Sequence, residues 1–560
     1  MEPNQLATSV VVIVIAASIC SAMIFVRRGM LRRLGYGVLC VCAVFSVASW
    51  IHFGDFHKIF VDANDSDLSH SRRKVERHLP FHFHEFFHYY LGAKYFRELG
   101  YVNLYDCTAL ADREIAEEER GAPRIGGYVR DLDDVLVDKT YDEALAHCRD
   151  EALARFSAGR WASFKHDIQE LHRLVPDDWW GGAVFDAGFN PPPSWILLSS
   201  TIANVIPIRI GQTQTFLWAT SLDMMLLVAC FVAFQSAFGA TTAALAAVYF
   251  GATLISSYGW NGGAFLRFTW FVAIVLSLGA MKRGRWALAG ALLGMATCDR
   301  LFPAGFAAFA MLPVAVKSIR SMDHRKILLH FCGAFAATVV VLVGASWAVF
   351  GFSAWHTFFS RIVRHSDIYY VMHIGLKKVL TYRDWVHGKN FHGHDGLMRF
   401  RSWNFRLRDT WAEMRPLILP LQALAVAGTV LATIRRHPYE AALIGGIVFM
   451  FVFNLPANYY YVVLTLVPAI VFRGAATSTT MPRRLRDYGV LTAFSAFWML
   501  TLVAPYLAGD DIIYNFYICS ALGVFLLIWI AAWIEPQWDF VAAIRRLRAP
   551  REAAMSPPTA

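Results

Sequence analysis

The residues around Glu85 are the first in the chain whose types and spacing could do chemistry. In the run HFHEFFH at 82–88, Glu85 lies among three histidines. On a helix His84 and His88 lie one turn apart, so HEFFH satisfies the HExxH pattern, in which two histidines bind zinc and the glutamate activates a water molecule. Alternatively, Glu85 is the acid–base residue of a sugar transferase, because a carboxylate can take a proton from an acceptor hydroxyl.

A catalytic zinc ion would need a third protein ligand. The candidates are His82, His57 and the HGHD run at 392–395. The chain has nineteen histidines, so a chance match to HExxH is not remote. A further interpretation is that the histidines are merely solvated on a helix at the membrane surface.

The composition indicates a polytopic membrane protein. The chain has 560 residues, of which 56% are hydrophobic, and it contains repeated apolar runs long enough to cross a bilayer. Its net charge of +10 does not require a nucleic-acid partner. The arginines lie in short loops between apolar runs, which is typical of cytoplasmic flanks of membrane helices.

The order of apolar runs and basic loops predicts the topology. Arg27, Arg28, Arg32 and Arg33 follow the first run, which places the N-terminus outside and the first loop in the cytoplasm. Few polar residues lie within the runs, Asp223 being the main one, and this argues against a transporter. The predicted spans are 6–26, 35–53, 213–235, 241–257, 264–280, 286–298, 302–317, 328–350, 416–434, 439–455, 457–472, 488–506 and 514–534.

These spans divide the chain into six parts. They are two N-terminal helices (1–53), a first extracytoplasmic domain (54–192), a central membrane part (193–350), a second outside loop (351–415), C-terminal helices (416–535) and a cytoplasmic tail, partly disordered (536–560). Helices are expected at 85–99, 108–120 and 141–175 of the first domain. The apolar segment 194–208 is short and bracketed by prolines, so we expect it to lie in or re-enter the interface.

Two further features lie on the outer face. Asp299 and Arg300 join the short runs 286–298 and 302–317, and charged residues at such helix breaks usually line a cavity. Cys107 and Cys148 flank a polar stretch of the first domain. They either form a disulfide or remain two free thiols.

Several motifs in order resemble the GT-C membrane glycosyltransferases, and most closely the polyprenyl-phosphate mannosyltransferase branch, glycosyltransferase family 87. The resemblance covers roughly residues 55–360. It begins with Glu85, the Tyr89-Tyr90 pair, Lys94, Gly100 and Leu104-Tyr105, and continues with Phe189-Asn190-Pro191-Pro192-Pro193, Asn261-Gly-Gly, Arg283-Gly-Arg285, Arg300-Leu-Phe-Pro303 and Gly351-Phe-Ser-Ala-Trp355. The chain departs from the family in having glutamate where aspartate is usual, an extra N-terminal span and a longer first domain.

The resemblance implies an all-α, GT-C-like fold with about 13 transmembrane helices, in a bacterial inner (plasma) membrane with the C-terminus in the cytoplasm. It also implies a hexosyl- or pentosyltransferase of cell-envelope glycans. A polyprenyl-phosphate-sugar donor would be used with inversion, and the acceptor would be a glycan, a lipid or a protein. Membrane lipids are the other expected partners. No cofactor is required, although a divalent metal ion could bind at Glu85 and the nearby histidines.

The expected roles of single residues follow from this chemistry. Glu85 would deprotonate the acceptor, with Asp55 as the alternate base. Arg300 would hold the donor phosphate, although it could instead pair with Asp299. The other candidates for the donor and phosphate site are Tyr89, Tyr90, Lys94, Arg361, Arg364, His365, Lys377 and Lys378. The alternatives from other classes are a membrane zinc metalloprotease using His84, Glu85 and His88, and a non-enzymatic transporter or scaffold.

Overall fold

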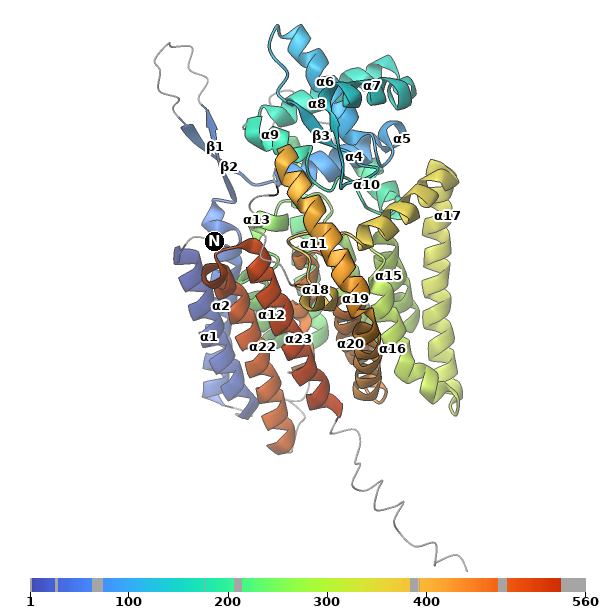
Figure 1. Cartoon of the computed structure of the whole chain (residues 1–560). Coiled ribbons are helices and arrows are strands. Elements are labelled where there is room, and N and C mark those ends of the chain that lie inside the picture. The colour runs from blue at the N-terminus through green and yellow to red at the C-terminus, as the bar shows by residue number, and fades with distance from the viewer. Residues whose placement is uncertain are drawn as a thin grey trace, which may run out of the picture.

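The structure is almost entirely helical and joins a membrane bundle to a domain at one of its ends (Figure 1). This computed structural model describes residues 3–25, 29–62, 74–175, 177–205, 214–382, 391, 393–471 and 481–534. Strands occur there only as two short hairpins. The predicted all-α membrane class is thus confirmed, whereas the tail 536–560 and residues 206–208 lie outside the described residues.

Seven helices are long and apolar enough to cross a membrane. They are α1 (Pro3–Phe25), α2 (Met30–Trp50), α11 (Gln214–Phe238), α17 (Met322–Ser366), α19 (Gly393–Thr433), α22 (Met481–Ala508) and α23 (Asp511–Ile534). Each of them coincides with a predicted span. The first helix begins at the end of the bundle that carries the additional domain, and α23 ends at the opposite end (Figure 1).

The other six predicted spans are shorter apolar helices. They are α12 (Ala240–Gly251), α14 (Thr269–Lys282), α15 (Trp286–Asp299), α16 (Pro303–Ser318), α20 (Pro438–Phe453) and the segment formed by the 3₁₀ helix η5 (Asn458–Leu466) and α21 (Pro468–Val471). Almost every residue of α14 and α20 is buried. These helices form the centre of the bundle, and the number of complete crossings among them stays a prediction.

Glycines allow the central helices to pack closely. A Cβ added at Gly290 of α15 would lie 2.1 Å from the carbonyl oxygen of Phe331 on α17. A Cβ at Gly446 of α20 would lie 2.4 Å from the ring of Phe306 on α16. Small residues at helix contacts are typical of membrane bundles, where close van der Waals packing drives association.

The first polar domain is built from many short elements. They are β1 (His57–Asp62), β2 (Lys74–Leu79), α3 (Phe83–Glu85), the π-helix η2 (Phe86–Leu91), α4 (Gly92–Lys94), α5 (Phe96–Leu99), α6 (Leu104–Glu118), β3 (Tyr128–Arg130), β4 (Asp138–Thr140), α7 (Tyr141–Glu151), the 3₁₀ turn η3 (Leu153–Arg155), α8 (Ala158–His172) and α9 (Asp177–Ala183). Below, it is called the ectodomain, after the predicted topology. Both hairpins, β1–β2 and β3–β4, are antiparallel.

Its predicted helices are only partly correct. The helix expected at 85–99 is interrupted at Tyr95, whose φ of −112° is not helical. The helix expected at 141–175 is two helices, because Ser157 accepts a hydrogen bond from the Arg160 amide and so begins α8 anew. The helix expected at 108–120 is α6, which begins four residues earlier.

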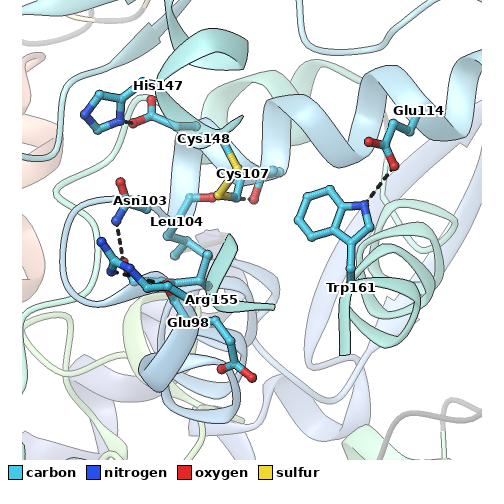
Figure 2. Close-up of a disulfide and its surroundings, with 12 residues drawn as sticks. Glu98, Asn103, Leu104, Cys107, Glu114, His147, Cys148, Arg155 and Trp161 are labelled. Carbon is cyan, nitrogen blue, oxygen red and sulfur yellow. Dashed lines mark hydrogen bonds and ion pairs between the residues drawn. A yellow bond between two sulfur atoms is a disulfide. The ribbon is translucent and has the colours of Figure 1, made fainter. Parts of the chain in front are cut away.

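A disulfide joins Cys107 of α6 to Cys148 of α7 (Figure 2). Of the two alternatives for these thiols, the structure therefore has the disulfide. Around it, the indole of Trp161 on α8 donates a hydrogen bond to Glu114 on α6 (2.8 Å between Nε1 and Oε2). These contacts hold α6, α7 and α8 together, and disulfides of this kind are typical of extracytoplasmic domains.

The second outside loop, predicted at 351–415, is mostly helical. Gly351, with φ of 81°, bends α17, and the helix then continues to Ser366. The short α18 (Leu376–Thr381) follows, and α19 begins at Gly393 rather than near 416. Hydropathy marks only apolar segments, so it did not reveal that the arginine-rich start of α19 is helical, and the place of 351–415 outside the membrane stays a prediction. The segment expected in the interface is α10 (Pro193–Val205), whose 13 residues are too few to cross a bilayer.

Candidate functional site

Four separate parts of the chain contribute to one buried group of side chains where the ectodomain meets the bundle. Glu85 ends α3, Tyr89 lies in the η2 that follows it, Arg267 lies two residues before α14, and Arg300 lies in the break between α15 and α16. Tyr459 and Tyr460 of η5 complete it. These six residues are called the Glu85 cluster below.

The π-helix η2 and the residue before it contribute two members of the Glu85 cluster. Glu85 directly precedes η2, and Tyr89 is in its wide turn. The apolar side chains of Phe86, Phe87 and Leu91 are buried, so packing on the other sides of the segment holds the turn in place. A π-turn is rare and frequently marks a functional site.

Glu85 forms an ion pair with Arg267. The distance between Glu85 Oε2 and Arg267 Nη1 is 3.2 Å, and the two side chains are 13% and 2% exposed. The contact does not have hydrogen-bond geometry, and neither Glu85 Oε2 nor Arg267 Nε and Nη1 has a hydrogen-bond partner. Buried polar groups are normally hydrogen-bonded, so atoms without partners indicate a place where a ligand completes the network.

Aromatic rings and a buried carboxylate hold Arg267. Its guanidinium lies 4.2 Å from the ring centroid of Tyr459 and 4.9 Å from that of Tyr89. Its backbone amide donates to Asp223 (2.6 Å between N and Oδ2), and the Phe268 amide donates to the other carboxylate oxygen. Asp223, the polar residue of span 213–235, therefore anchors the start of α14.

Arg300 lies on the other side of Tyr89. Its Nη1 donates to the carboxylate of Asp299 (2.8 Å to Oδ1), and its Nε donates to the hydroxyl of Tyr460 (3.1 Å). The Tyr89 ring centroid is 5.9 Å from the Arg300 guanidinium. The pairing with Asp299, one of the two alternatives from the sequence, is thus present, yet Arg300 Nη2 has no hydrogen-bond partner.

Burial raises the pKa of Glu85 above its ordinary value, although the charge of Arg267 opposes the shift and that of Arg300 does so more weakly. The carboxylate of Asp186 adds to the rise. A carboxylate with a raised pKa is a better proton acceptor near neutral pH than an exposed one. Glu85 therefore suits a general base beside two guanidinium groups.

The histidines of HEFFH are engaged in other contacts. His88 hydrogen-bonds to the hydroxyl of Tyr105 (2.7 Å from Nε2), and its Nδ1 faces Asp186 at 3.8 Å. Burial lowers the pKa of His84 to about 4. Within the described ranges, no group of three or more histidine, cysteine, aspartate or glutamate side chains is placed to hold a metal ion. The π-turn replaces the regular helical turn that the HExxH pattern assumes.

Three predicted site residues serve the fold instead. The ammonium of Lys94 is buried against Asp167 (2.6 Å to Oδ2). The Tyr90 hydroxyl donates to the carbonyl oxygen of Ala203 (3.1 Å), and Lys378 donates to that of Val371. Their assignment to the donor site stays a prediction, and each has a local or distant partner that a single sequence does not reveal.

The remaining candidates lie away from Glu85. The Asp55 carboxylate is 72% exposed and lies 3.7 Å from a ring nitrogen of His78, and it is not among the charges that act on Glu85. The other four candidates line a separate pocket; they are Arg361, Arg364, His365 and Lys377.

Arg267 is the one cation of the Glu85 cluster that sequence reasoning missed. It was counted within the predicted span 264–280, where a charged residue is itself an indication of a functional site. Asp186, which acts on both Glu85 and His88, gave no comparable sequence signal.

In chemical terms, the cluster combines a proton acceptor with guanidinium donors that can hold an oxyanion. Such an arrangement suits the transfer of a group from a phosphate to a hydroxyl, since one part takes the proton and the other stabilises the leaving phosphate. In comparisons with protein-family models, with curated proteins and with solved structures, nothing matches this chain.

Proposed function

We propose that this protein is a GT-C-type membrane glycosyltransferase, with about 13 transmembrane helices, that transfers a sugar from a polyprenyl-phosphate-linked donor to an acceptor on the extracytoplasmic face. The observation that carries the proposal is the Glu85 cluster. A carboxylate from the ectodomain and two guanidiniums from the bundle lie in one buried group, and several of their polar atoms have no hydrogen-bond partner. The resemblance of the motif order to glycosyltransferase family 87 supports the same assignment.

The reaction would use these residues in complementary ways. Glu85 accepts the proton of the acceptor hydroxyl as its oxygen forms a bond to the anomeric carbon of the sugar. The bond between that carbon and the phosphate oxygen breaks on the opposite side, which inverts the configuration. The electron pair stays on the polyprenyl phosphate, and Arg300, with its unpaired Nη2, stabilises this leaving group.

Arg267 would have two tasks in this scheme. Before donor binding its charge lowers the pKa of Glu85 and so opposes the effect of burial. Once a phosphate is bound, Arg267 Nε and Nη1 are donors that can share it with Arg300. The rings of Tyr89 and Tyr459 lie over the guanidinium of Arg267, and Tyr89 also lies near that of Arg300, so these contacts form in a buried, low-dielectric place that strengthens them.

Identification of the lipid that co-purifies with the protein tests this assignment most directly. We expect polyprenyl phosphate to co-purify with the full-length protein and to be extractable and identifiable by mass spectrometry. The variant R300Q should lose it, whereas R320Q, which removes an exposed charge at the end of α16, should retain it.

Metal analysis of the same preparations separates the zinc-protease alternative. Stoichiometric zinc that is lost in the variant H84A, together with the lack of any polyprenyl phosphate, would contradict the proposal. Transfer of a radiolabelled sugar from a polyprenyl-phosphate donor to extracted envelope acceptors by the wild type, but not by E85Q, would support it.

A further inference from the structure

A second pocket lies beside the ectodomain and shares no residue with the Glu85 cluster. It has a volume of about 450 Å³ and lies between the loop 132–136, the end of α17 and the start of α19. Its lining residues are Leu132, Asp133, Asp134, Val135, Leu136, Asn190, Arg361, Arg364, His365, Asp367, Ile368, Lys377, Arg401, Phe405, Arg408 and Trp411. This space is called the basic pocket below.

Positive charge is in excess in the basic pocket. Five lysine and arginine side chains line it, against three aspartates. Burial, together with the nearby Arg361, lowers the pKa of His365 to about 4, so this histidine contributes hydrogen-bonding capacity rather than charge at neutral pH. The lining therefore carries a net charge of about +2, which would balance a dianion.

The aspartates neutralise only two of the five cations. Arg364 pairs with Asp133 (3.0 Å between Nη2 and Oδ1) and Lys377 with Asp367 (3.4 Å between Nζ and Oδ1). The Lys377 ammonium also lies 5.0 Å from the ring centroid of Trp411. Both pairs lie at the exposed side of the pocket, since Arg364 and Asp367 are at least half exposed.

Three arginines of the lining have no carboxylate partner among the described residues. Arg408 donates to the backbone carbonyl oxygen of Asp367 (3.0 Å), and the guanidinium of Arg401 lies over the ring of Phe405 at 5.6 Å. Arg361 is only 8% exposed; it donates to the carbonyl oxygen of Leu132 and to the side chain of Asn190, and its Nε has no hydrogen-bond partner.

Without a bound anion, this arrangement of positive charges is energetically unfavourable. Arg361 is nine-tenths buried and not paired with a carboxylate, so its two hydrogen bonds to neutral oxygens replace its lost hydration only in part. Guanidinium groups suit phosphate, because they donate two hydrogen bonds in a planar fork. Helix α19 runs from the ectodomain into the bundle (Figure 1). The N-terminal half of α19 and the ectodomain loop 132–136 line the pocket, so a water-soluble anion and a lipid headgroup are both candidate occupants.

We propose that the basic pocket is a second anion site, separate from the Glu85 cluster, and that it binds a phosphate-class oxyanion. The same chemistry could come from two sources, a free phosphate or the phosphate of an anionic lipid headgroup. The site does not depend on glycosyl transfer, so it can be tested without any knowledge of the sugar or the acceptor.

The test uses the full-length protein in phosphatidylcholine nanodiscs. Binding of inorganic phosphate is measured by calorimetry at constant ionic strength, with sodium chloride as the reference salt. In parallel, native mass spectrometry measures the retention of phosphatidylglycerol added before reconstitution. The double variant R401Q/R408Q removes two pocket cations, and the matched control R399Q/R406Q removes the same charge from exposed positions of the same helix that do not line the pocket.

We expect one of the two anions to bind the wild type and the control, and to bind R401Q/R408Q at least ten-fold more weakly. A loss of phosphate binding in that variant assigns the site to a soluble anion, and a selective loss of phosphatidylglycerol assigns it to a lipid headgroup. The proposal is overturned if neither anion binds, or if both double variants lose binding equally, since that would indicate general surface charge alone. Neither result depends on Glu85 or Arg300.

Discussion

The Glu85 cluster and the basic pocket both bring cations to the boundary between the ectodomain and the bundle. They differ in how far these cations are buried and in how they are paired with carboxylates. In the Glu85 cluster two arginines are buried among tyrosine rings, each close to a carboxylate. In the basic pocket five cations share three aspartates, and several side chains are largely exposed. The charges of the first region are thus fixed in a buried network, whereas part of the charge of the second is open to solvent.

This difference has a physical meaning. Charges buried in a low-dielectric site interact strongly, and they are held in a fixed geometry, which suits stabilisation of a transition state. Exposed charges interact weakly and are screened by salt, but in excess they raise the local concentration of an anion. The comparison therefore predicts chemistry at the Glu85 cluster and association at the basic pocket.

The largest expected effect is on transfer activity when the proposed base is removed. The variant E85Q keeps the shape of the side chain but cannot accept a proton, so we expect the rate to fall by about 10²–10⁴-fold. The variant D55N changes an exposed carboxylate outside the cluster and should leave the rate unchanged. If both variants were equally active, chemistry would have to be sought outside the Glu85 cluster.

The next largest expected effect is on the free energy of unfolding, and it compares the loss of a buried ion pair in the ectodomain with the loss of an exposed one. Replacing Lys94 by methionine leaves Asp167 buried without its cation, with only the Tyr95 hydroxyl as a donor, and we expect a loss of roughly 3–5 kcal/mol in the free energy of unfolding. The variant R364Q breaks the exposed pair with Asp133 and should cost less than about 1 kcal/mol. Denaturation of the purified protein, followed by tryptophan fluorescence, measures both. Similar losses would remove the contrast between the two kinds of pair.

Raising the salt concentration should affect anion binding at the basic pocket more than transfer at the Glu85 cluster. Anion binding at the basic pocket should weaken about ten-fold or less when sodium chloride is raised from low to high concentration, since its outer pairs are open to solvent. The rate constant of transfer at saturating donor should change little, because the Glu85 cluster is buried. Calorimetry and single-turnover kinetics at two salt concentrations measure these quantities. A steep salt dependence of the rate constant would contradict the proposed burial of the reacting groups.

The smallest expected effect is a shift in the pH dependence of transfer. The pKa of Glu85 is raised, so its carboxylate becomes protonated at a higher pH than an exposed glutamate, and the rate should fall as the pH drops through that raised value. Removing the charge of Arg267 in R267Q should move this acid limb to still higher pH, because Arg267 lowers the Glu85 pKa. Rate profiles between pH 4 and 8 would show it. A limb that stays in place would argue against Glu85 as the titrating group.

Much of the fold could be predicted from the sequence, because apolar runs report burial in a bilayer directly. All thirteen predicted spans correspond to helices, and the break at Asp299 and Arg300 lies beside the cluster. The helices within the second outside loop were missed for a related reason. Its arginines hide a helix from hydropathy, although arginine is a good helix former.

Single residues of the candidate site could be predicted only where a residue of that type is energetically unfavourable at its position. Arg300 at a helix break and Glu85 before a tyrosine pair could be singled out, and the structure places both beside Tyr89. The role of Lys94 could not be predicted, since its partner Asp167 is 73 residues away in the chain. Sequence order shows which groups are unusual, whereas their partners depend on tertiary packing.

The short central helices have a consequence for the lipid around the protein. Helix α15, on which Leu288 and Met295 are exposed, has 14 residues, which is about 21 Å of helix against a hydrocarbon layer of about 30 Å. Where α15 approaches the lipid, acyl chains must compress or tilt to match it. Headgroups would then sink toward Arg300 at the end of α15, so a long-chain phosphate could reach the guanidinium without leaving the leaflet.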